Sequence, residues 1–164
     1  MYTSPVVQGR NVYFLDGMMN AVQLPETVEE PFECEELWGG DLEGEFYASP
    51  LVKDDQIHLV DKAAKYYVLD GASGKTILSR VLELAAAQPD SKASVFSSPC
   101  LAGKRLFISD DAGQTIVQET ADEGAAITKN ALPNGSGGTP AFSGKRIFTR
   151  GGEFLYCLTA PPKE

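Results

Sequence analysis

Residues 49–78 read SPLVKDDQIHLVDKAAKYYVLDGASGKTIL, and this stretch decides the fold. Pro50 has no N–H to donate, so it belongs at the first residue of a strand or on an exposed edge. A turn signal at 54–55 precedes the β-branched and apolar run 56–60, which predicts a half-buried strand. The aromatic and branched run 66–69 is too short for a helix and predicts another strand.

A tight turn at 70–74 then leads into a further strand at 76–78. The side chains of Asp70 and Ser73 can bond to nearby backbone groups, and Gly74 tolerates positive φ. The stretch therefore predicts a meander of four short antiparallel strands.

This meander recurs along the chain. Its Ser/Thr-Pro start appears at Ser4-Pro5, Ser49-Pro50, Ser98-Pro99 and Thr139-Pro140, with starts 45, 49 and 41 residues apart. Each start is followed by a turn and a strand. A period of about 40 to 50 residues with four strands per unit is typical of a β-propeller blade, because one small twisted sheet cannot bury both faces and must stack on the next.

The sequence therefore predicts an all-β protein, with one propeller domain over residues 1–164. We expect about four blades of four-stranded antiparallel sheets, at about 4–48, 49–97, 98–138 and 139–160. The last blade has only three predicted strands, because two prolines and four further residues complete the sequence after residue 158.

Residues 68–78 resemble the AxDxxTGxxxW docking motif of pyrroloquinoline-quinone-like (PQQ-like) propeller repeats. Val68 stands at the Ala position, Ser73 at the Thr position and Leu78 where Trp is usual. The first blade resembles the motif at its closing position, Trp38, which we interpret as a residue that docks one blade on its neighbour. The residues assigned to the structural repeat are Pro5, Trp38, Pro50, Asp70, Ser73, Gly74, Pro99, Gly113, Pro140 and Gly152.

The resemblance implies a fold that serves several functions. The family includes quinoprotein dehydrogenases and cofactor-free scaffolds of outer-membrane assembly. Such dehydrogenases hold the quinone between a tryptophan and a vicinal Cys-Cys disulfide, beside a calcium ion. This sequence has one Trp and no Cys-Cys pair.

The sequence thus favours a non-catalytic scaffold that binds another protein or supports assembly. We assign no catalytic, cofactor-binding or metal-binding residue. A partial or degenerate PQQ-dependent dehydrogenase, with PQQ and calcium, is the alternative, and a polysaccharide-binding module is a further one.

Ring closure stays open at this stage, since the rings of this family have seven or eight blades. The chain is expected to be a piece of a larger propeller that lacks N-terminal blades, or a half-ring completed by a homodimer. A lone four-bladed ring is the less favoured arrangement. The first and last sheets would otherwise expose apolar faces.

Charge and hydropathy limit the partners. The net charge of −9 and the pI near 4.6 disfavour binding to nucleic acid or anionic lipid. No apolar run reaches the roughly 20 residues that span a bilayer, and no signal peptide precedes residue 4. As given, the sequence predicts a cytoplasmic protein; a lost leader would place it in the periplasm or cell envelope.

The remaining candidates receive structural interpretations. His58 is expected to occupy an ordinary strand position. The three cysteines form no CxxC; Cys100 and Cys157 are expected to pack as small apolar residues. Six glutamates between residues 25 and 36 indicate a solvated connector. Residues 80–94 predict a tolerated surface loop with at most two helical turns, the alternative being a docking insertion.

Overall fold

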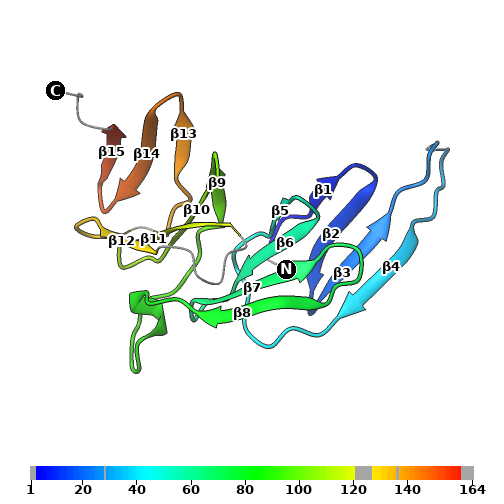
Figure 1. The fold of residues 1–164 in the computed structure, drawn as a ribbon, viewed down its shortest axis with the longest axis horizontal. Helices are drawn as coiled ribbons and strands as arrows, with labels where there is room; N and C mark the ends of the chain where they lie inside the picture. Colours follow the sequence, from blue (N-terminus) through cyan, green and yellow to red (C-terminus); the bar gives the residue numbers. More distant parts are fainter. Residues whose placement is uncertain (1–2, 28, 121–126, 136, 160–164) are drawn as a thin grey trace.

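The computed structural model describes residues 3–27, 29–120, 127–135 and 137–159. Within these residues the chain forms four antiparallel sheets that follow one another in sequence order, each built from consecutive strands. Figure 1 shows the sheets arranged side by side along an arc. The prediction of an all-β, partial propeller is confirmed.

The first two sheets have four strands each. The first sheet contains β1 (Val6–Gln8), β2 (Asn11–Asp16), β3 (Met18–Gln23) and β4 (Glu35–Gly40). The second sheet contains β5 (Leu51–Lys53), β6 (Gln56–Val60), β7 (Lys65–Asp70) and β8 (Thr76–Val81).

The third sheet also has four strands, and the fourth sheet has three in the described part of the chain. The third contains β9 (Cys100–Ala102), β10 (Arg105–Ser109), β11 (Gln114–Glu119) and β12 (Thr128–Ala131). The fourth contains β13 (Ala141–Ser143), β14 (Arg146–Gly151) and β15 (Phe154–Thr159).

The hairpin between β5 and β6 illustrates how local sequence sets these sheets. Asp54 and Asp55 have φ values of 50° and 58°, so both turn residues adopt the left-handed conformation. Such a two-residue turn matches the twist of the flanking strands, and aspartate tolerates the conformation better than most residues. The turn fixes the register in which Lys53 pairs with Gln56.

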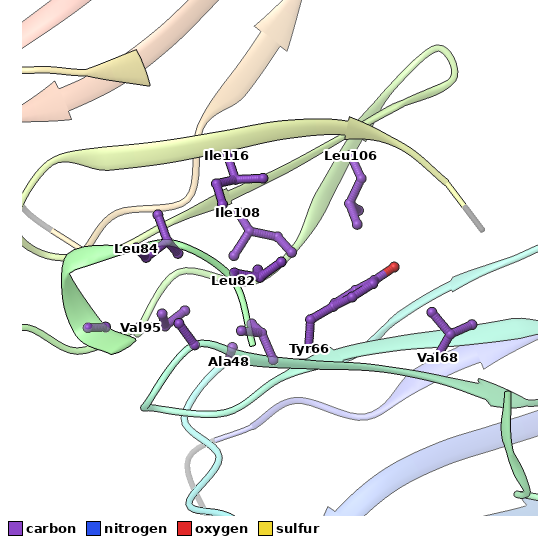
Figure 2. Packing of buried hydrophobic residues seen from close by; sticks show 12 residues of the cluster. Ala48, Tyr66, Val68, Leu82, Leu84, Val95, Leu106, Ile108 and Ile116 are labelled. Carbon is purple, nitrogen blue, oxygen red and sulfur yellow. The ribbon is translucent and has the colours of Figure 1, made fainter. Parts of the chain in front are cut away.

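Two clusters of buried side chains lie between successive sheets. One joins the first and second sheets, with Tyr13 and Leu15 facing Ile57 and Leu59. The other joins the second and third sheets (Figure 2). Its members are Ala48, Val60, Ala64, Tyr66, Val68, Leu82, Leu84, Ala86, Val95, Leu106, Ile108 and Ile116.

The connector 82–95 forms part of this second cluster, so its interpretation as a tolerated surface loop was wrong. Leu82, Leu84 and Val95 are 1%, 0% and 0% exposed. Figure 2 shows them between the strands of the two sheets. Regular helix is limited to the 3₁₀ turn η1 (Ala85–Ala87).

Two aspartates at the β10–β11 turn hold this connector in place. The backbone N–H of Ala86 donates to Asp110 Oδ2 over 3.3 Å, and that of Ser94 donates to Asp111 Oδ1 over 2.8 Å. The turn aspartates therefore fix the connector of one blade to the next blade.

Candidate functional site

Trp38, at the end of the first sheet, docks on the second sheet. Its indole Nε1–H donates to the carbonyl oxygen of Gly71 over 3.0 Å. Its ring lies so close to Gly74 that a Cβ there would meet ring carbons at 2.5 Å. The centroid of the Tyr13 ring lies 6.1 Å from that of Trp38, in a tilted arrangement. The only tryptophan of the sequence is thus engaged between sheets.

The receiving turn is the predicted motif 70–74. Asp70 Oδ1 accepts hydrogen bonds from Ser73 N–H and Ser73 Oγ–H, at 2.8 Å and 2.5 Å. These bonds lower the pKa of Asp70 from its usual value, with the Ser73 hydroxyl as the largest cause. Gly74 has a φ of +69°, and its amide donates to the Asp70 carbonyl. The turn thus presents Gly74 to the Trp38 ring and the Gly71 carbonyl to its indole N–H.

The docking position recurs in register in the next two sheets. Trp38 pairs with Ala21, and Leu78 pairs with Val68, with a register irregularity directly after each pair. In the third sheet the corresponding pair is Val117 and Thr128, because Val117 has the equivalent place opposite β10. The docking side chain therefore changes from Trp to Leu to Thr along the chain.

This change in size is reflected in the packing. Leu78 contacts the cluster between the second and third sheets. Between the third and fourth sheets lies a cavity of about 350 Å³. Its lining includes Phe107, Val117, Ile147, Leu158 and Pro140. Side chains that line such a space lack partner atoms on one side, so this interface is packed less densely than a filled core.

The Ser/Thr residues of the repeat starts form a ladder of hydrogen bonds between sheets. The backbone N–H of Ser4 donates to Ser49 Oγ, that of Ser49 to Ser98 Oγ, and that of Ser98 to Thr139 Oγ1. All three donor–acceptor distances are 2.9 Å. The prolines that follow, Pro5, Pro50, Pro99 and Pro140, each directly precede the first strand of a sheet.

The two other predicted repeat glycines lie beside residues 132–135. Gly113 has a φ of +93°, and a Cβ there would meet the carbonyl oxygen of Leu132 at 2.5 Å. Gly152 has a φ of +58°, and a Cβ there would lie 3.0 Å from Asn134 Cβ. The structure thus places both glycines at turns that need positive φ, away from the Trp38 dock.

His58 lies within β6, as the sequence predicts, and its side chain belongs to a buried polar group. Its side chain is 0% exposed, and Nδ1 lies 2.6 Å from the hydroxyl of Tyr66. Among the described residues Nε2 has no hydrogen-bond partner. The guanidinium of Arg80 lies 5.9 Å from the Tyr66 ring centroid and donates to Gln118 Oε1. The second sheet packs against β10–β11 of the third sheet, and this packing brings the polar side chains together. No local sequence pattern reveals such a contact.

Burial shifts the acid–base equilibria of this group. Desolvation lowers the pKa of His58 to about 4, although Asp54 acts in the opposite direction. Desolvation likewise raises the pKa of Tyr66, so its hydroxyl stays protonated. His58 is therefore neutral at physiological pH.

We expect His58 to make the fold acid-sensitive between pH 6.5 and about 4. The unfolded imidazole binds a proton below its ordinary pKa and the folded one does not, so stability is full above pH 6.5 and falls as pH drops toward 4. At 1.36 kcal/mol per pKa unit this contribution is about 2 to 3 kcal/mol at pH 4.5.

Urea unfolding of the wild type and of His58→Gln at pH 7.5 and pH 4.5 measures this contribution. The variant should lose about 2 to 3 kcal/mol less than the wild type on acidification, because glutamine does not titrate. An equal loss in both proteins would contradict the assignment.

The cysteines and the acidic connector show no shared site. Cys34 and Cys157 are exposed, so the prediction that Cys157 packs as a small apolar residue was wrong. Cys100 is half-buried, and desolvation raises the pKa of its thiol to about 11. In the described part of the chain, no three His, Cys, Asp or Glu side chains lie close enough together to hold a metal ion. No helix in these residues is long and apolar enough to cross a membrane.

Comparison with known proteins gives likenesses of structure alone. No family model and no curated protein matches the sequence. The crystal structure of BamB from Moraxella catarrhalis matches 94% of this chain, with a TM-score of 0.67 and 13% identity. The chain spans 47% of BamB, about half its length.

Two further structures match to a similar degree. The quinohemoprotein alcohol dehydrogenase ADHIIG from Pseudomonas putida HK5 matches 90% of this chain and 28% of its own, with a TM-score of 0.63 and 9% identity. The computationally designed Ika4 protein matches 98% of this chain and 94% of its own, with a TM-score of 0.65 and 11% identity.

These likenesses define the class of fold. The chain has the fold of a partial β-propeller, the architecture shared with BamB and with the quinohemoprotein alcohol dehydrogenase. The resemblance of residues 68–78 to the PQQ-like repeat therefore identified the correct fold.

Proposed function

We propose that this protein is a non-catalytic PQQ-like propeller that serves as a protein-binding or assembly scaffold. The observation that carries the proposal is the position of Trp38. Its indole is committed to Gly71 and Gly74 of the neighbouring sheet, as a structural residue of the repeat. No second tryptophan is present to stack on a quinone.

The cysteines support the same proposal. Cys34, Cys100 and Cys157 are separated by 66 and 57 residues, so the sequence lacks the vicinal pair that the quinone-dependent members of the family use. All three are free thiols in the structure.

The surface favours a protein partner over nucleic acid. The net charge of −9 repels phosphate backbones. The β14–β15 hairpin exposes Phe154 and Leu155 by 66% and 75%. The two side chains point to opposite faces of the hairpin, so each face offers one exposed large apolar side chain to a protein partner.

We expect no specific binding of PQQ, because Trp38 is already packed and the disulfide clamp is missing. Equilibrium dialysis of the protein against PQQ with calcium chloride measures this directly, with dye reduction in the presence of primary alcohols as a second readout. The expected result is no saturable uptake of PQQ. The PQQ concentration in the dialysis should reach about 100 times the dissociation constant of a micromolar site, so that such a site would be detected.

The dehydrogenase alternative makes the opposite prediction. It requires calcium-dependent uptake of one PQQ per chain and dye reduction that depends on both PQQ and alcohol. A matched control is the Trp38→Phe variant, which retains an aromatic ring: reduced quinone uptake by this variant would place the cofactor at Trp38 and overturn the scaffold proposal.

A further inference from the structure

The first and fourth sheets each have one face that is not covered by another sheet of the described residues. Side chains alternate between the two faces of a strand. In β2, Tyr13 and Leu15 face the second sheet, so Val12 and Phe14 face the other way. We define the open first face as the residues that pairing places on that side: the apolar Val7, Val12, Phe14, Met18 and Val22, and the polar Asp16 and Asn20.

The fourth sheet has the matching arrangement. In β14, Ile147 and Thr149 line the cavity toward the third sheet, so Phe148 faces the other way. We define the open last face as the residues that share that side by strand pairing: the less polar Ala141, Phe148, Leu155 and Cys157, and the polar Ser143, Arg146, Arg150 and Thr159. Leu155 is 75% exposed and Cys157 is exposed as well.

The repeat indicates what each open face is built to contact. Val12 and Phe14 lie eight and ten residues after the Ser/Thr that starts their repeat. The residues at these positions in the second and third sheets are Ile57, Leu59, Leu106 and Ile108, each 0% exposed against the preceding sheet. The open first face is therefore the half of an inter-sheet interface that receives a preceding sheet.

Phe148 lies nine residues after the start of its repeat. It is therefore equivalent to Tyr13, His58 and Phe107. Tyr13 and His58 are 2% and 0% exposed against the following sheet. The open last face is therefore the half that receives a following sheet. One chain thus carries both halves of one further interface.

The hydrogen-bond ladder has the same polarity. It runs from Ser4 N–H toward Thr139 Oγ1, always from one sheet to the next. Within the described residues the backbone N–H of Thr139 donates to no further hydroxyl, and Ser4 Oγ accepts from no preceding amide. The N–H of Thr139 and the Oγ of Ser4 are therefore the same kinds of donor and acceptor that bond between successive sheets inside the chain.

We propose that the occupant of these faces is a second copy of this chain, bound so that the last face of each copy packs on the first face of the other. The pairing deepens, and rests on, the proposed role as an assembly scaffold. Thr139 N–H of each copy would donate to Ser4 Oγ of the other. Two copies of four sheets form a ring of eight, and their combined length is about that of BamB, of which one copy spans 47%.

Two properties favour a second copy over a different protein. The missing contact is the same contact that the chain makes between its own sheets, so the complementary surfaces are encoded in one sequence. Two-fold closure also buries both open faces of both copies at once.

Light scattering after size-exclusion chromatography, over a concentration series, tests the pairing. The wild-type chain should have twice the 17.6 kDa mass of one copy. Val7→Glu on the first face and Leu155→Glu on the last face should each raise the dissociation constant at least tenfold. Both side chains are exposed in the single chain, at 60% and 75%, so each variant keeps its fold.

Val81→Glu is the matched control. Val81 is 63% exposed on β8, on neither open face, and the change is the same as at Val7. It should leave the dissociation constant within about twofold of the wild type. An equal effect at Val81, or a wild type that stays monomeric at every concentration, would overturn the pairing.

Mixing the two face variants tests its polarity. An equimolar mixture of Val7→Glu and Leu155→Glu can form one interface between two unaltered faces, so it should dimerise at least about tenfold more tightly than either variant alone. No gain on mixing would exclude the head-to-tail arrangement. Because these readouts are masses, their failure would leave the PQQ dialysis result, and the scaffold proposal it tests, unaffected.

Discussion

Replacing Trp38 with alanine is expected to lower the free energy of unfolding by about 3 kcal/mol, at the lower end of the range for large aromatic deletions because the ring is half-buried. The loss combines the contact with Gly74, the ring pair with Tyr13 and the hydrogen bond to Gly71. Urea unfolding followed by circular dichroism measures it, since the variant lacks the only tryptophan of the chain.

Two further variants separate the parts of this loss. Trp38→Phe keeps a ring over Gly74 but donates no hydrogen bond to Gly71, so about 1 kcal/mol of the loss should remain. Gly74→Ala places a Cβ at 2.5 Å from the indole, at a φ of +69°. Its cost should fall in the Trp38→Ala background, because the clash with the ring is removed. Additive costs would show that Trp38 does not dock on Gly74.

Leu84→Ala is expected to cost about 2 to 5 kcal/mol, the range for deleting a fully buried leucine. Leu84 is 0% exposed in the cluster between the second and third sheets. The connector around it is anchored through Asp110 and Asp111, so the surroundings cannot easily collapse into the space that the substitution leaves.

Glu83→Ala provides the control within the same connector. Glu83 is exposed, so this substitution should change the free energy of unfolding by no more than about 0.5 kcal/mol. Similar small effects of Leu84→Ala and Glu83→Ala would mean that the connector is a surface loop after all.

The fold could be predicted from the sequence because of its four Ser/Thr-Pro starts, its turn signals and its alternating strands. Hairpin formation depends on residues only a few positions apart, as at Asp54 and Asp55, so local patterns were sufficient. The docking turn at 70–74 was readable for the same reason, because its side chains bond within five residues of one another.

Contacts between sheets were decided only by the tertiary structure. The burial of His58 beside Tyr66 and Gln118, and the role of Leu84 as core, depend on which residues of another sheet face them. Such contacts join positions tens of residues apart, and the same short apolar pattern fits a core or a surface equally well. The sequence by itself therefore determined the blades and their repeat, whereas the stacking of one blade on the next determined which apolar residues became core and which faces stayed open.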